Sequence, residues 1–190
     1  AYGEQPLDKH YDAEVLICLY DTWANWGYKP NTRVSSALHE RFGLEWDAEC
    51  GRYQVNVRSE VSGEVERYLR GGRWVAVHYQ GDSSPDKKNL TDNQADDICQ
   101  AIWELKRSPL VLDFRNKSGL SATRWVKLTD PKWHAYNAEN MCALIAQCEA
   151  FIGIDSGPSK CASATNTPAL VIWTGHHPAP FHDPAPNTTH

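Results

Sequence analysis

The stretch that most constrains how this chain can fold is residues 150–175, which read AFIGIDSGPSKCASATNTPALVIWTG. Two short apolar runs, Phe151–Ile154 and Ala169–Trp173, are typical of buried strands. Between them, the turn Asp-Ser-Gly-Pro supplies a carboxylate, a capping hydroxyl, a permissive backbone and a proline suited to a helix's first turn, and small residues follow. The stretch therefore predicts a strand, a tight turn, a helix and a second strand.

The segment before this stretch repeats the same alternation. Strands are predicted at 74–79, 109–114 and 125–128, and helices at 91–106 and 139–148. The helix at 91–106 opens with a Thr-x-x-Gln capping box and carries apolar residues at a period of 3.6. Alternating strands and helices predict an α/β fold with a parallel, doubly wound, Rossmann-like sheet. The turn at 155–158 then becomes a ready phosphate site, because the first amides of a helix are unpaired and its dipole is positive there.

Three regions are predicted along the chain. Residues 1–72 form an N-terminal region of mixed structure, with a strand at 14–20, a helix at 32–42, a short strand at 52–57 and a helix from Ser59 that ends before Gly71. Residues 73–175 form the Rossmann-like domain. Residues 176–190 are rich in His, Pro and Asp and are expected to be an extended tail without another element.

The motif IGIDSGPSKCASATNTPALVIWTG resembles the donor-site signature of the lipopolysaccharide heptosyltransferases, the family 9 glycosyltransferases of GT-B architecture. The usual form of that signature is a strand, Asp, Ser or Thr, Gly, two variable residues, His, a small-residue helix, Thr-Pro and a last strand. Lys160 stands where the family usually has His, and Trp-Thr-Gly at 173–175 replaces the commoner Leu-Phe-Gly. The resemblance implies that this chain is the C-terminal, donor-binding half of such an enzyme.

The resemblance also implies roles for individual residues. Asp155 would contact the donor sugar, and the amides of Ser156, Gly157 and Ser159 would face its diphosphate, with Lys160 beside them. The family's phosphate-binding lysine lies in the loop after the strand at 74–79, where Lys87 is a better match than its neighbour Lys88. His78 and Gln80 would line the same loop. The Asp113 prediction comes from the fold and not from the resemblance: Asp113 lies near the carboxyl end of a strand, where an acidic group can hold ribose hydroxyls, whereas the family usually has glycines at this edge. A role unrelated to ligand binding stays open for each residue, such as a helix cap for Asp155 or a solvated surface lysine for Lys87.

Size and composition limit the function classes. At 190 residues the chain is about half of a two-domain GT-B enzyme, so a second chain is an expected partner. Its 24 acidic and 19 basic residues include no basic block, which argues against nucleic acid as a binding partner. Without an apolar run of membrane length or a signal segment, a cytoplasmic location is expected. The six cysteines form no C-x-x-C pair and are read as reduced core thiols, so no metal or cofactor is expected.

Three functions remain open. The first is a glycosyltransferase half that binds an ADP- or other NDP-sugar and, completed by an acceptor domain, transfers the sugar with inversion and without a metal. The second is a non-catalytic nucleotide-sugar-binding or assembly module, and the third is a GT-B-shaped sugar epimerase. No catalytic base can be assigned, because the glycine-rich loop and the acceptor-domain Asp of the resembled family have no counterpart after residue 20.

Overall fold

The computed structural model describes residues 43–45, 55–82, 85–130, 138–175 and 186–190. The predicted elements at 14–20 and 32–42 lie outside these residues, and residues 55–57 are not in a strand. The strands are β1 Trp74–His78, β2 Ser108–Leu112, β3 Val126–Leu128, β4 Ala150–Ile154, β5 Ala169–Ile172 and β6 Thr188–Thr189. The helices are α3 Ser59–Leu69, α4 Pro85–Lys88, α5 Asp92–Glu104, α6 Ala138–Ala146 and α7 Gly157–Ala164.

The six strands form one sheet in the order β3-β2-β1-β4-β5-β6, and every neighbouring pair is parallel. This confirms the predicted α/β, doubly wound, Rossmann-like sheet. The strand order reverses between β1 and β4, which pair with His78 beside Gly153. In open parallel sheets the ligand crevice lies outside the carboxyl ends of the strands at this point. The end of β1 and the turn after β4 therefore meet where a ligand is expected.

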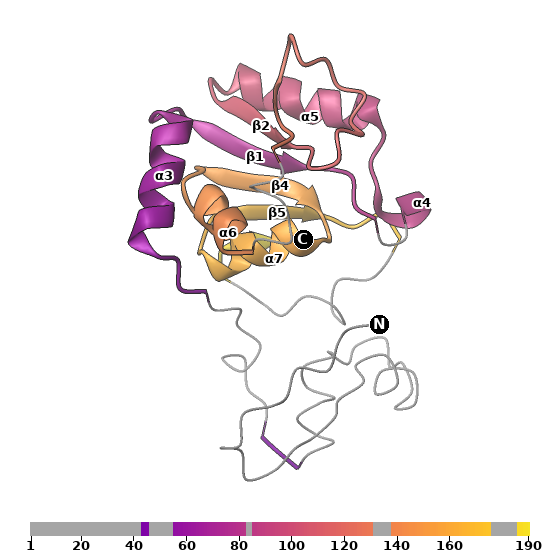
Figure 1. The fold of residues 1–190 in the computed structure, drawn as a ribbon. Helices are drawn as coiled ribbons and strands as arrows, with labels where there is room; N and C mark the ends of the chain where they lie inside the picture. Colours follow the sequence, from indigo (N-terminus) through magenta and orange to yellow (C-terminus); the bar gives the residue numbers. More distant parts are fainter. Residues whose placement is uncertain (1–42, 46–54, 83–84, 131–137, 176–185) are drawn as a thin grey trace.

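Helices cover both faces of the sheet because successive strand residues point to opposite sides. On one face, Ala76 of β1 and Phe151 of β4 belong to the core that α3, α6 and α7 complete. On the other face, Val75 and Val77 pack in a second core under α5. Figure 1 shows α5 on the side of the sheet opposite to α3, α6 and α7. Because helices cover both faces, strand residues on both sides are buried, which explains why the strands read as nearly continuous apolar runs.

Local signals in the sequence account for the ends of the helices. The side chain of Thr91 accepts the Gln94 amide, and the Gln94 side chain accepts the Thr91 amide, so the predicted capping box starts α5. Helix α3 ends at Leu69; its C-cap residue Arg70 has a left-handed φ of 49°, and Gly71 follows at 67°. Among the helices described, none combines the length and the apolar character needed to cross a membrane.

The last residues of the chain differ from the expected tail, since β6 extends the sheet beside β5. The Asn187 carbonyl accepts the Ala169 amide, and its side-chain amide donates to the carbonyls of Ala162 and Thr167. The Ser163 and Thr188 hydroxyls lie 3.1 Å apart. These bonds come from polar side chains with no apolar periodicity, which is why the pattern of hydrophobic residues gave no sign of this strand.

Candidate functional site

A pocket of about 640 Å³ lies at the point where the strand order reverses. Its walls are the segments that follow β1, β2 and β4, together with the first turn of α7. Six of the residues predicted for the donor site line it: His78, Gln80, Asp113, Asp155, Ser156 and Gly157. The carboxyl edge of the sheet therefore brings together side chains that are as much as 79 positions apart in the sequence.

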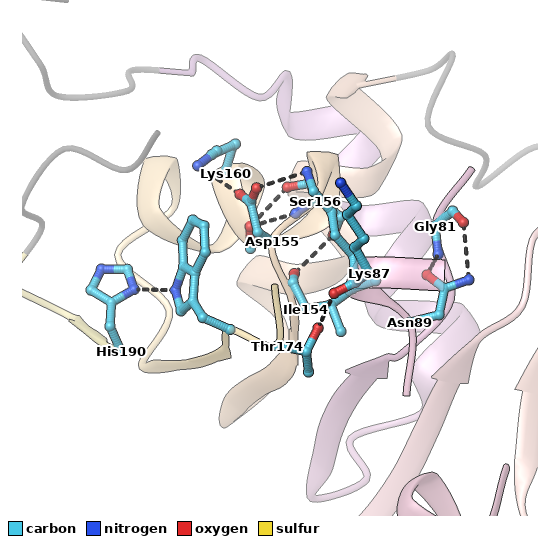
Figure 2. Close-up of polar contacts among 12 residues, drawn as sticks. Gly81, Lys87, Asn89, Ile154, Asp155, Ser156, Lys160, Thr174 and His190 are labelled. Carbon is cyan, nitrogen blue, oxygen red and sulfur yellow. Dashed lines mark hydrogen bonds and ion pairs between the residues drawn. The ribbon is translucent and has the colours of Figure 1, made fainter. Parts of the chain in front are cut away.

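The carboxylate of Asp155 lies between two lysines. Lys88 Nζ is 3.1 Å from Oδ2, and Lys160 Nζ is 3.1 Å from Oδ1, as Figure 2 shows for Lys160. The Asp155 side chain is only 12% exposed. Burial acts to raise the pKa of Asp155, but the charges and hydrogen bonds of Lys160 and Lys88 outweigh it and hold that pKa below its usual range. Asp155 is therefore an ionised group in a locally cationic corner of the pocket.

The turn after Asp155 opens α7, as the sequence predicts. The Ser156 amide donates to Ser159 Oγ at 3.2 Å, and Ser159 Oγ donates to the Ser156 carbonyl at 2.8 Å. Ser159 is fully buried, and its hydroxyl fixes the turn through these two hydrogen bonds to the Ser156 backbone. Gly157 lies at the pocket in the first turn of the helix, where amides have no intrahelical acceptor. The positive end of the α7 dipole thus points to the same corner as Lys88 and Lys160.

His78 is buried at the end of β1 and lines the pocket between the loop after β2 and the turn after β4. Its Nδ1 lies 3.0 Å from Ser156 Oγ, and Ser156 Oγ donates to the Ile154 carbonyl at 3.1 Å. A hydroxyl has one proton, so a Ser156 that donates to Ile154 accepts the proton on Nδ1 of a neutral imidazole. Burial lowers the pKa of His78 to about 4, although the charges of Asp82 and Asp113 oppose the shift. His78 therefore stays neutral at pH 7 and positions Ser156.

The Asp113 carboxylate organises the loop after β2. Oδ1 accepts the Lys117 amide at 2.8 Å, Oδ2 accepts the Ser118 amide at 3.2 Å, and Lys127 Nζ lies 3.4 Å from Oδ2. The Asp113 side chain is 4% exposed and Lys127 is 12% exposed. Asp113 lines the pocket, as predicted, but its oxygens are already engaged by the protein. A role with ribose hydroxyls would require it to share these acceptors.

A buried network ties this loop to α5. Tyr79 Oη lies 2.6 Å from Asp92 Oδ1 and 2.5 Å from Ser118 Oγ, and the Gly119 amide donates to the same Asp92 oxygen at 3.2 Å. Tyr79 is 2% exposed. Burial first, and then the hydrogen bond to Asp92, raise the pKa of Tyr79, so the phenol keeps its proton and donates it to the carboxylate. The network fixes the wall of the pocket that follows β2.

We expect Tyr79→Phe to lower the free energy of unfolding by about 1 to 3 kcal/mol, because it leaves Asp92 and the buried Ser118 hydroxyl without a shared partner. Chemical denaturation of the two proteins measures the difference. Tyr68→Phe is the matched control, since Tyr68 on α3 is 48% exposed and the same change there should cost much less. Equal losses for the two variants would contradict the role given to the network.

The two adjacent lysines of α4 have different surroundings. Lys88 lines the pocket and contacts Asp155, whereas Lys87 is exposed and does not line it. The Lys87 carbonyl accepts the Thr174 hydroxyl at 2.5 Å, which ties α4 to the end of β5 (Figure 2). Neighbouring residues on a helix point about 100° apart, so the rotation of this single turn about its axis decides which of the two lysines faces the pocket. The sequence predicts a loop here, and a predicted loop does not indicate that rotation.

Other charged residues at the pocket were not predicted as donor-site residues. Asp82 lines it from the loop after β1, Arg115 and Lys117 line it from the loop after β2, and Lys88 lines it from α4. Their signal in the sequence is weak, because polar loop residues are ordinary surface residues in most proteins. Within the described residues, no group of three or more His, Cys, Asp or Glu side chains is arranged to hold a metal ion.

Comparisons with known proteins identify the fold of the chain. No protein-family model matches the chain, and no curated protein does. The structure is similar to that of a glycosyl transferase family 9 protein from Veillonella parvula DSM 2008, with a TM-score of 0.65 and 10% identity over 85% of this chain and 50% of the other. It is also similar to E. coli ADP-heptose LPS heptosyltransferase II, with a TM-score of 0.59 and 13% identity over 72% and 44%. The chain thus spans about half the length of either protein, and the resemblance seen in its motif is matched by a glycosyltransferase-like fold.

Proposed function

We propose that this chain binds a nucleotide-activated sugar and acts as the donor-binding half of a GT-B glycosyltransferase, with residues 73–175 as the donor-binding domain. The observation that carries the proposal is the pocket corner in which Lys88, Lys160 and the first turn of α7 surround Asp155. Two cations and a helix dipole against a single carboxylate leave an excess of positive charge, which suits a diphosphate. Asp155 would then accept hydrogen bonds from hydroxyl groups of the sugar.

The charges in this corner also suit departure of the nucleotide without a metal. When a sugar is transferred, negative charge develops on the diphosphate that leaves, and fixed ammonium groups and amides stabilise it in place of a cation. The position that is His in the resembled family is Lys160 here, and its ammonium contacts Asp155 directly. Lys160 therefore adds to the cationic character of the site instead of supplying a titrating imidazole.

A complete transferase needs an acceptor-binding part and a catalytic base. We propose that a second chain supplies them, since this chain spans about half of the similar enzymes. Transfer would then proceed with inversion and without a metal. The buried free thiols of Cys99, Cys142 and Cys148 suit a reducing compartment, so we propose a cytoplasmic location.

Calorimetric titration with ADP, UDP and GDP, followed by a donor hydrolysis assay, tests the proposal. We expect micromolar to millimolar binding of at least one nucleotide, and slow release of free sugar from the matching donor. Binding without any hydrolysis would favour a non-catalytic nucleotide-sugar-binding module, which the engagement of Asp155 by two lysines also suits. Folded protein that binds none of the three nucleotides would remove both functions.

The two lysines of α4 provide a matched pair of variants. We expect Lys88→Ala to weaken nucleoside diphosphate binding by about 1 to 3 kcal/mol, as for loss of a hydrogen bond to a charged group, because Lys88 lines the pocket. Lys87→Ala should leave the affinity nearly unchanged, since Lys87 is exposed and contributes its backbone carbonyl to Thr174. Titration of both variants with a nucleoside diphosphate and with its nucleoside makes the test. A loss confined to Lys87→Ala would support the assignment made from the family motif instead.

A further inference from the structure

The loop that follows β2 holds two basic side chains in a defined place. The Asn116 amide donates to the Asp113 carbonyl at 3.1 Å, and Asn116 has a φ of 51°, so the chain turns sharply there. The Asp113 carboxylate then accepts the next two amides, those of Lys117 and Ser118. Lys127 Nζ donates to the Ser118 carbonyl at 3.0 Å from β3. The backbone on both sides of the turn is therefore fixed by buried groups.

The side chains of Arg115 and Lys117 reach from this loop across to Asp82, which follows β1. Arg115 Nη2 lies 2.8 Å from Asp82 Oδ2, and Lys117 Nζ lies 3.5 Å from Oδ1. All three residues line the pocket. Two cations here share one carboxylate, as Lys88 and Lys160 do around Asp155 on the opposite side of the pocket. The pocket therefore has an excess of positive charge at both ends.

This excess of positive charge is local. The charged groups that line the pocket or pair with its carboxylates are three acidic residues, Asp82, Asp113 and Asp155, and five basic residues, Lys88, Arg115, Lys117, Lys127 and Lys160. The chain as a whole has a net charge of −5. A ligand with a single anionic group would match one end of the pocket and leave the other end unmatched.

The end formed by Arg115 and Lys117 is where a ribose is expected. In sheets with this strand order, an acidic residue near the end of β2 binds free ribose hydroxyls, whereas an Arg nearby accommodates a phosphate on the ribose. Here the acidic residue, Asp113, already accepts two amides and contacts Lys127. The groups that give this end of the pocket its excess of positive charge are Arg115 and Lys117, which share the single carboxylate of Asp82. The chemistry of this end therefore suits an anion on the ribose more than a free hydroxyl.

We infer that the pocket takes a nucleotide with a second phosphate on its ribose, bound by Arg115 and Lys117 while Lys88, Lys160 and α7 hold the 5′-phosphates. The inference rests on the proposed function and names its ligand more closely. Without this phosphate, the Asp82 carboxylate pairs with both cations, and the phosphate would replace it. Because the side chains of Arg115, Lys117 and Asp82 are 44%, 60% and 55% exposed, water weakens this pairing and a phosphate with two negative charges replaces it readily.

The test compares nucleotides that differ by one phosphate. The 5′-monophosphates of adenosine, uridine and guanosine are titrated beside their 2′,5′- and 3′,5′-bisphosphates. For the preferred base, we expect one of the bisphosphates to bind at least 10-fold more tightly than the monophosphate. Equal affinities would overturn the inference while leaving the proposed function intact, since that is read separately from nucleoside diphosphate binding. A protein that binds no nucleotide of any kind would overturn both.

Variants assign the effect to the residues. The double variant Arg115→Gln, Lys117→Gln should lose the 10-fold preference, because its affinity for the bisphosphate should fall much more than its affinity for the monophosphate. Asp82→Asn should act in the opposite direction and increase the preference, because it removes the competing carboxylate. Arg124→Gln is the control, since Arg124 pairs with Asp96 on α5 and does not line this pocket. A preference that survives in the double variant would place the second phosphate elsewhere and overturn the assignment.

Discussion

The free energy of unfolding is expected to fall by roughly 2 kcal/mol between pH 7 and pH 5 because of His78 alone. Burial lowers the pKa of His78 to about 4 in the folded protein, against 6.5 for an ordinary histidine. Between these values the unfolded chain binds the additional proton, so stability rises with pH. The contribution is complete above about pH 6.5 and is lost progressively as the pH falls toward 4.

Two measurements isolate this histidine. Denaturation of the His78→Asn variant over the same pH range should show a flatter dependence, because an amide can replace Nδ1 beside Ser156 but does not titrate. An NMR titration of the imidazole should show no protonation of His78 above about pH 5. A His78 that titrates near pH 6.5 would contradict the buried, neutral imidazole that forms the floor of the pocket.

Much of the fold can be predicted from the sequence because its signals are local. The capping box at Thr91 and Gln94 fixes the start of α5, and the glycines at 71 and 72 follow the end of α3. Strands β1, β2, β4 and β5 are short apolar runs between turns, and alternation with helices implies that they are parallel. Strand β6 could not be predicted, because it is held by the polar side chain of Asn187 and has no apolar pattern.

The candidate site was predictable only in part, for a related reason. Asp155 and Ser156 follow a buried strand directly, so the topology alone places them at the carboxyl edge of the sheet. The partners of each carboxylate depend on tertiary distances that the sequence does not contain. Asp113 has the same strand-end position as Asp155, yet backbone amides occupy its oxygens. The difference arises from the turn at Asn116, whose left-handed backbone brings those amides back to the carboxylate.

The largest loss of stability is expected from Gly153→Ala in the middle of the sheet. A Cβ at position 153 would lie 2.4 Å from the His78 carbonyl oxygen and 2.8 Å from Phe151 Cζ. The carbonyl belongs to β1, which pairs with β4 at this residue, so the clash can be relieved only by moving one strand away from the other. Overpacking a core by one methyl group costs about 1 to 3 kcal/mol and occasionally more. We expect a loss of about 3 kcal/mol here, because the nearest atom belongs to the backbone.

The same substitution elsewhere in the chain gives a control of opposite sign. A Cβ at Gly63 in α3 would have no atom within 4 Å, and alanine is a better helix former than glycine. Gly63→Ala should therefore raise the free energy of unfolding by about 0.5 to 1 kcal/mol. Chemical denaturation of both variants gives the comparison. If Gly153→Ala retains its full stability, then β1 and β4 do not approach as closely as the pairing of His78 with Gly153 requires. The pocket at the reversal of strand order would lose the geometry on which its two cationic ends depend.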